Sequence, residues 1–117
     1  MERLVVYHNP ACGSSRGTLE ILSERGVAHD VVEYLRTPLD RPTLERFLDL
    51  LPDPPADLVR KDKRFKELGL HPAAYGTREQ VVLVLLAHPE LMQRPVVVRG
   101  DRAVLARPPE KVLALLD

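Results

Sequence analysis

Cysteine is almost absent from the sequence, because Cys12 is the only one among 117 residues. A lone cysteine excludes an intramolecular disulfide and any zinc site built on two or more thiolates of the chain. Apart from His8, the histidines are His29, His71 and His88, and they lie too far apart in sequence to form a ligand pattern. We therefore expect no metal site. Cys12 therefore reacts either without a second thiol or with a thiol of a partner molecule.

The chain also lacks an excess of charge, tryptophan and long apolar runs. The 17 Lys and Arg residues balance the 17 Asp and Glu residues, and only five aromatic side chains are present. This composition offers neither a basic surface nor a stacking platform for nucleic acid, so no nucleic-acid partner is expected. The longest apolar run, residues 81–87, is far shorter than the roughly 20 residues that span a bilayer.

The beginning of the chain has no apolar segment of the ~7 to 15 residues that a signal peptide requires. We therefore expect a cytoplasmic protein without a membrane partner. A chain of this length can bury a core without disulfides, so a single domain over residues 1–117 and a monomeric state are expected.

Short apolar runs alternate with helical patterns along the first third of the chain. Residues 4–7 predict a buried strand, and residues 18–22 predict a helix that ends at Gly26. Residues 31–35 predict a second strand. A helix between two strands favours a right-handed crossover, so the two strands are expected to be parallel.

The middle of the chain is expected to be helical and the end to form a hairpin followed by a helix. The first helical segment is capped by Asp40 and ended by Pro52–Pro55, and a shorter one follows over residues 58–68. A third, mostly buried helix is predicted over residues 81–87, preceded by a Thr77–Gln80 capping box. The hairpin is predicted over residues 95–106 with its turn at 99–101, and the last helix from Pro108 onward.

This order of elements is that of a thioredoxin-like α/β fold. Such a fold would have three layers and a mixed four-stranded sheet, with a helical insertion over about residues 40–90 between a βαβ unit and a ββα unit. The order alone leaves other α/β topologies open.

The segment from His8 to Arg16 places the only thiol between the end of a strand and the start of a helix. The free N–H groups of a first helical turn and the helix dipole favour an anion, so Cys12 is expected to titrate below its ordinary value. The amides of Gly13, Ser14 and Ser15 can bind an oxyanion beside the sulfur. Gly13 also allows a close approach of the backbone.

Other interpretations of these residues remain open at this point. Cys12 can be a small buried hydrophobe, and neither Cys-x-x-Ser nor Cys-x3-Arg is specific by itself. His8 can lower the pKa of the thiol or serve as a structural donor. Arg60, Arg94 and Arg107 resemble ordinary surface arginines by composition, although the last two adjoin prolines at positions that often line clefts.

Over essentially its whole length the sequence resembles the glutaredoxin-coupled, ArsC-like arsenate reductases, a family with a thioredoxin fold. The resemblance rests on residues 7–16 (YHNPACGSSR), 58–61 (LVRK), 88–98 (HPELMQRPVVV) and 107–108 (RP). It implies that Cys12 is the nucleophile and that His8 favours its thiolate. It also implies that Arg60, Arg94 and Arg107 bind and stabilise the oxyanion. Pro95 resembles a proline that these folds hold in the cis form.

The resemblance implies an enzyme that reduces arsenate to arsenite. The Cys12 thiolate attacks arsenic, glutathione attacks the adduct, and glutaredoxin then removes the glutathione, so that no bound cofactor is needed and glutathione is a co-substrate. Guanidinium groups suit this chemistry because their planar forks match two oxygens of a tetrahedral anion. Two alternatives remain: a thiol oxidoreductase acting on glutathionylated proteins, and a transcription-associated binding module of the same fold.

Overall fold

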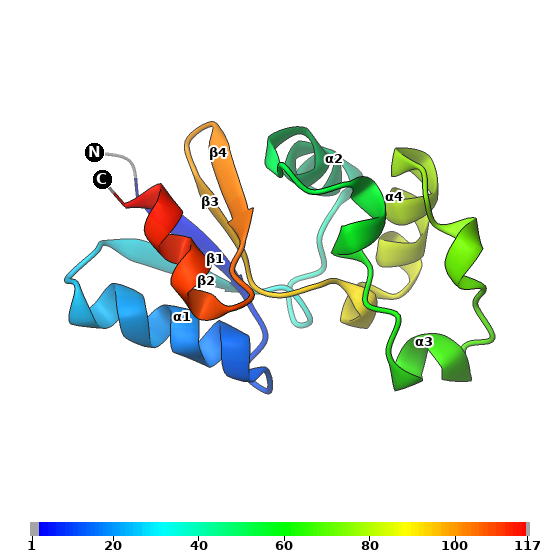
Figure 1. Cartoon of the computed structure of the whole chain (residues 1–117), viewed down its shortest axis with the longest axis horizontal. Helices are drawn as coiled ribbons and strands as arrows, with labels where there is room; N and C mark the ends of the chain where they lie inside the picture. Colours follow the sequence, from blue (N-terminus) through cyan, green and yellow to red (C-terminus); the bar gives the residue numbers. More distant parts are fainter. Residues whose placement is uncertain (1–2, 117) are drawn as a thin grey trace.

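A mixed four-stranded sheet lies at the centre of one half of the molecule (Figure 1). The structure is a computed structural model and describes residues 3–116. The strands are β1 (Leu4–His8), β2 (His29–Glu33), β3 (Val96–Arg99) and β4 (Arg102–Leu105). Their order is β2-β1-β3-β4, with β1 parallel to β2 and antiparallel to β3, and β3 antiparallel to β4. The predicted parallel crossover and the predicted hairpin are both confirmed.

The second strand begins and ends two residues earlier than the sequence pattern predicts. β2 pairs with β1 from the Leu4–His29 pair to the His8–Glu33 pair, and the ladder stops where β1 stops. Tyr34 follows directly and is fully buried. The apolar pattern that suggested a strand as far as residue 35 instead reflects the burial of Tyr34, which lies beyond the end of the strand.

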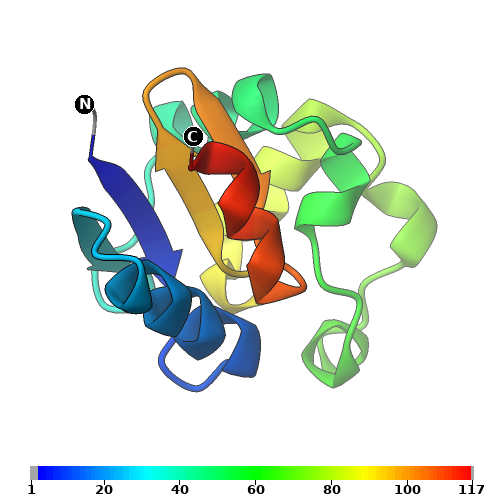
Figure 2. The same cartoon turned by 60° about the vertical axis from the view of Figure 1, so that its left-hand side comes forward.

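One face of the sheet is covered by the α-helix α1 (Gly13–Glu24) and the 3-10 helix η4 (Pro109–Leu115), which lie side by side in Figure 2. The core between them contains Leu4, Val6, Leu22, Val97, Ala106, Val112 and Leu115. Gly26 closes α1 with a φ of 64°, as the sequence predicts, because glycine has no Cβ to clash in that conformation. The predicted last helix is present as a 3-10 helix.

A close approach between α1 and η4 depends on Gly17. A Cβ built on Gly17 would lie 2.9 Å from Cγ of Pro109, which is closer than real Cβ contacts. The proline ring belongs to the first turn of η4 and has little freedom to move. Gly17 therefore allows the chain that enters η4 to pack directly on α1.

The opposite face meets a helical insertion between β2 and β3, whose helices gather away from α1 in Figure 1. Its helices are α2 (Arg41–Leu50), η1 (Pro55–Leu58), α3 (Lys63–Glu67), η2 (Pro72–Ala74), α4 (Arg78–Ala87) and η3 (Pro89–Leu91). The Asp40 cap and the Thr77–Gln80 capping box are both confirmed.

The predicted helical stretch over 58–68 is only partly correct. Residues after Leu58 leave the helical path, and Val59 instead forms an isolated antiparallel bridge with Met92. The amide of Arg60 donates to the carbonyl of Leu91 at 2.7 Å. Pairing with a distant segment thus takes precedence over local helical preference, and a regular helix resumes only at α3.

The helix α4 packs against α2 but is not buried on every side. Val81, Val82, Val84 and Leu85 are buried, whereas Leu83 is 52% exposed. The expectation of a mostly buried helix holds for that one face. Among residues 3–116, no helix is both long and apolar enough to cross a membrane.

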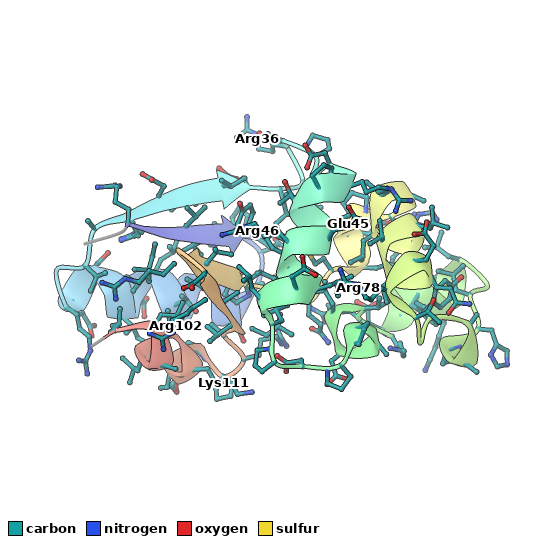
Figure 3. All side chains as sticks on the ribbon, turned by 90° about the horizontal axis from the view of Figure 1, so that it is seen from above. Arg36, Glu45, Arg46, Arg78, Arg102 and Lys111 are labelled. Carbon is teal, nitrogen blue, oxygen red and sulfur yellow. The ribbon has the colours of Figure 1, made fainter. Side chains whose placement is uncertain are left out.

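The insertion and the sheet share one apolar core and are joined by polar contacts. The rings of Tyr7 on β1 and Phe47 on α2 meet edge to face at 4.7 Å between centroids. Nη2 of Arg46, which Figure 3 shows between α2 and the sheet, donates to the carbonyl of Gly100 in the hairpin turn at 2.6 Å. The result is the expected α/β fold with helices on both faces of a mixed sheet.

Substituting Gly17→Ala is expected to lower the free energy of unfolding by about 1 kcal/mol. Alanine favours a helix over glycine by ~1 kcal/mol, but overpacking against Pro109 costs about 1 to 3 kcal/mol. Gly76→Ala is the matched control, because a Cβ there meets nothing within 4 Å. Urea unfolding measures both variants, and a Gly17→Ala protein more stable than the wild type by the ~1 kcal/mol of helix propensity alone would contradict the close approach.

Candidate active site

Three strand ends meet at one edge of the sheet and carry the predicted site. Tyr7, near the end of β1, pairs with Val96 at the start of β3, and Val96 pairs with Leu105 at the end of β4. The chain segments that carry Cys12, Arg94 and Arg107 lie just beyond these ends. Residues far apart in sequence are therefore brought to one place by strand register.

The loop that presents Cys12 is held by Asn9. The carbonyl of Asn9 accepts from the amide of Cys12 at 3.0 Å, and its Oδ1 accepts from the amide of Ala11 at 3.0 Å. The amide of Asn9 donates to Oγ of Ser15 at 3.3 Å. Asn9 was not among the predicted site residues, although an Asn-Pro pair directly after a strand is a recognisable turn signal.

Two arginines contact the thiol region. Nη1 of Arg107 donates to Sγ of Cys12 at 3.3 Å and to the carbonyl of Arg94 at 3.1 Å. The side chain of Arg94 lowers the pKa of the same thiol, and its Nη1 donates to the carbonyl of Glu90 at 3.2 Å. Pro95 is cis, as predicted, and the Arg107–Pro108 bond is cis as well.

Cys12 is the N-cap of α1 and is buried, with 8% of its surface exposed. Burial raises the pKa of the thiol. The amide of Ser15, the side chain of Arg94, the amide of Ser14 and the side chain of Arg107 favour the thiolate, and together they outweigh burial and lower this pKa to about 7. The site therefore favours the thiolate at neutral pH more than water does.

The residues that follow Cys12 contribute in different ways. The Ser14 and Ser15 amides both lower the pKa of the thiol, whereas the Ser15 side chain is buried and accepts from the amide of Asn9. A Cβ on Gly13 would meet only the Arg16 side chain, at 4.0 Å. The protein itself thus leaves room for a side chain at Gly13. The close approach to the backbone that the sequence suggests there would therefore be made by a bound ligand.

Arg60 and His8 lie at the edge of this cluster without a hydrogen bond to the thiol. Nε of Arg60 lies 3.4 Å from Oδ2 of Asp62, and the bridge between Val59 and Met92 places its segment beside that of Arg94. Burial lowers the pKa of His8, an effect that Glu33 opposes. Burial therefore favours the neutral form of His8, and this residue is not among the groups that shift the pKa of Cys12.

Tyr34 is a further residue of this cluster that the sequence analysis did not single out. It is fully buried, and its hydroxyl makes no hydrogen bond of normal geometry, as is also true of Nε of Arg94. Burial raises the pKa of Tyr34, while the charge of Arg94 and, more weakly, that of Arg60 lower it. No sequence signal distinguishes this tyrosine from an ordinary core aromatic.

The arrangement is suited to binding an oxyanion next to a nucleophile. Helix amides and two guanidinium groups surround one sulfur, and all of them favour negative charge. Within the described part of the chain, no group of three or more His, Cys, Asp or Glu side chains could hold a metal ion. These features define a single-cysteine thiolate site on a thioredoxin-like scaffold.

Comparison with known proteins agrees with this class. The ArsC family pattern matches residues 7–115. The chain is 40% identical over 117 residues to the uncharacterized protein YfgD of Escherichia coli K12, covering 98% of both chains. It is 38% identical over 120 residues to an arsenate reductase of the same organism, covering 99% of this chain and 82% of that one. The chain belongs to the ArsC family.

A solved structure supports the same assignment. The arsenate reductase from Vibrio cholerae superposes with a TM-score of 0.87 at 34% identity, covering 98% of each chain. The predicted family and the thioredoxin-like fold are thus confirmed.

The thiol of Cys12 is expected to titrate with an apparent pKa near 7, below the ~8.5 of a free cysteine. Thiolate absorbance near 240 nm against pH measures this value. Because the folded pKa lies below the unfolded one, the thiolate stabilises the fold above about pH 8.5, and this contribution is lost as the pH falls through about 7.

Arg107→Gln should move the titration to higher pH, because it removes a charged donor at 3.3 Å from the sulfur. Arg41→Gln is the control, since Arg41 pairs with Glu79 on the surface of the helical insertion. A wild-type pKa at or above 8.5, or equal titration of both variants, would contradict the activation of Cys12 by Arg107.

Proposed function

We propose that this protein is an arsenate reductase that converts arsenate to arsenite through a thiolate adduct of Cys12, with glutathione and glutaredoxin as electron donors. The observation that carries this proposal is a single thiol at the start of a helix that accepts a hydrogen bond from Arg107 and whose pKa is lowered by Arg94 and two helix amides as well. The relatives named as arsenate reductases support it.

In the first step the Cys12 thiolate attacks arsenic, and one arsenate oxygen leaves as water after taking up protons. Arg94 and Arg107 would bind the remaining oxygens through charge-assisted hydrogen bonds. The Ser14 and Ser15 amides would stabilise the negative charge next to the sulfur. We assign Arg60 to the same oxyanion site, where it would approach from the Arg94 side.

In the second step a glutathione thiol reacts with the adduct. An S–S bond forms between glutathione and Cys12 while the S–As bond breaks, and its electron pair remains on arsenic, which leaves as arsenite. Glutaredoxin then exchanges with the mixed disulfide and restores the Cys12 thiol. Two thiols supply the two electrons, which fits a chain with one cysteine.

Because burial favours the neutral form of His8, we assign stabilisation of the thiolate to the arginines and the helix amides rather than to this histidine. The arginines favour the reductase over a binding module, because a docking surface has no need of guanidinium groups that stabilise a thiolate. A cytoplasmic location would provide both glutathione and glutaredoxin.

The test is arsenate-dependent oxidation of NADPH in the presence of glutathione, glutaredoxin and glutathione reductase. Cys12→Ser should abolish turnover. Arg94→Ala should lower kcat/KM roughly ten- to a hundredfold, since a charge-assisted hydrogen bond contributes about 1.5 to 3 kcal/mol. Arg94→Lys should recover only part of this loss, because the charge remains but the fork is lost.

Arg41→Ala serves as the surface control and should retain wild-type kcat/KM. Full activity of Arg94→Ala would contradict its role in binding the oxyanion. No arsenate turnover, combined with Cys12-dependent release of glutathione from a glutathionylated peptide, would favour the thiol oxidoreductase instead.

A further inference from the structure

A charged cavity lies against Arg107 on the side of the helical insertion. Its volume is about 420 Å3, within the usual range of small-molecule sites. It lies between the chain around η1 and the helix η4, and Figure 3 shows Lys111 beside the chain that follows α2. The polar residues that line it are Asp53, Asp57, Lys61, Gln93, Arg107 and Lys111.

The charges of this cavity are largely unused by the fold. Asp53, Asp57, Lys61 and Lys111 form no ion pair with any residue of the described range 3–116. Nζ of Lys61 is held in place by backbone carbonyls, the nearer at 3.0 Å. Oε1 of Gln93 is buried and has no hydrogen-bond partner, although buried polar atoms are usually bonded.

The cavity and the reactive sulfur have Arg107 as a common neighbour. Arg107 both lines the cavity and donates to Sγ of Cys12 at 3.3 Å. A small molecule bound against Arg107 from this side would therefore have the sulfur within reach of a flexible arm. Because the chain contains no second cysteine, the thiol that completes a reaction at Cys12 must arrive on another molecule.

We propose that this cavity is the binding site of the thiol co-substrate and that it recognises a small zwitterionic peptide thiol of the glutathione type. Lys61 and Lys111 would bind its carboxylates, and Asp53 or Asp57 would bind its ammonium group. Gln93 would accept from a peptide N–H. This inference rests on the proposed function, in which a thiol co-substrate reacts at Cys12. The exchange of thiols at Cys12 can nevertheless be measured without arsenate.

The exchange reaction balances without arsenate. The Cys12 thiolate attacks one sulfur of glutathione disulfide, a new S–S bond forms to Cys12, and the original S–S bond breaks with release of one glutathione thiolate. Recognition of the charged ends in the cavity would accelerate this reaction relative to exchange with an uncharged disulfide.

The experiment compares the rates at which Cys12 reacts with glutathione disulfide and with bis(2-hydroxyethyl) disulfide, both followed by the mass of the modified protein. Lys111→Glu and Lys61→Glu should each lose roughly tenfold in rate with glutathione disulfide, because charge reversal removes an attraction and adds a repulsion. Their rates with the uncharged disulfide should remain at the wild-type value, which also verifies a folded site.

Lys66→Glu is the matched control, since it makes the same change of charge on the exposed side of α3 and lines no part of this cavity. Equal rates with glutathione disulfide for Lys111→Glu, Lys66→Glu and the wild type would overturn the inference. Equal losses of rate with both disulfides would also overturn it. The substitutions would then have changed the reactivity of the Cys12 thiol rather than the binding of glutathione disulfide.

The arsenate assay with the same proteins separates the two proposals. Intact arsenate reduction by the wild type, with variants that react with glutathione disulfide at the wild-type rate, would refute only the cavity. Selective exchange without arsenate reduction would support the cavity and refute the reductase.

Discussion

The hydrogen bond between the Arg107 guanidinium and the Cys12 sulfur joins two residues that are 95 positions apart in the chain. It opposes the main electrostatic difficulty of the site, because burial of a thiol disfavours its charged form. Together with Arg94 and the first amides of α1, Arg107 stabilises the Cys12 thiolate at a buried position that by itself would favour the neutral thiol. The reactivity of the site depends on this balance.

Strand register is the reason that these groups meet. Because β3 runs antiparallel to both of its neighbours, its beginning lies beside the end of β1 and the end of β4. The Cys12 loop and the segments of Arg94 and Arg107 leave the sheet at this one edge. Gly17 then lets the chain after Arg107 pack closely on α1, which keeps the guanidinium within reach of the sulfur.

Local signals predicted the elements well wherever neighbouring residues determine the structure. The Asp40 cap, the Thr77–Gln80 capping box and the Gly26 terminus each depend on contacts within one turn. The prediction was wrong around residues 59–62, where Val59 pairs with Met92, a residue that a local pattern cannot take into account. The last helix was found, but its 3-10 geometry was not.

By itself the sequence determined that a single thiol lies at the start of a helix, that no second thiol of the chain can assist it, and that arginines are available to bind an anion. Only the tertiary structure decided which arginines reach the sulfur. It bonds Arg107 to Cys12, lets Arg94 lower the pKa of the same thiol, pairs Arg60 with Asp62, and places a charged cavity against Arg107. The physical reason is that side-chain contacts across the fold depend on strand register and helix packing, which the spacing of residues along the chain does not contain.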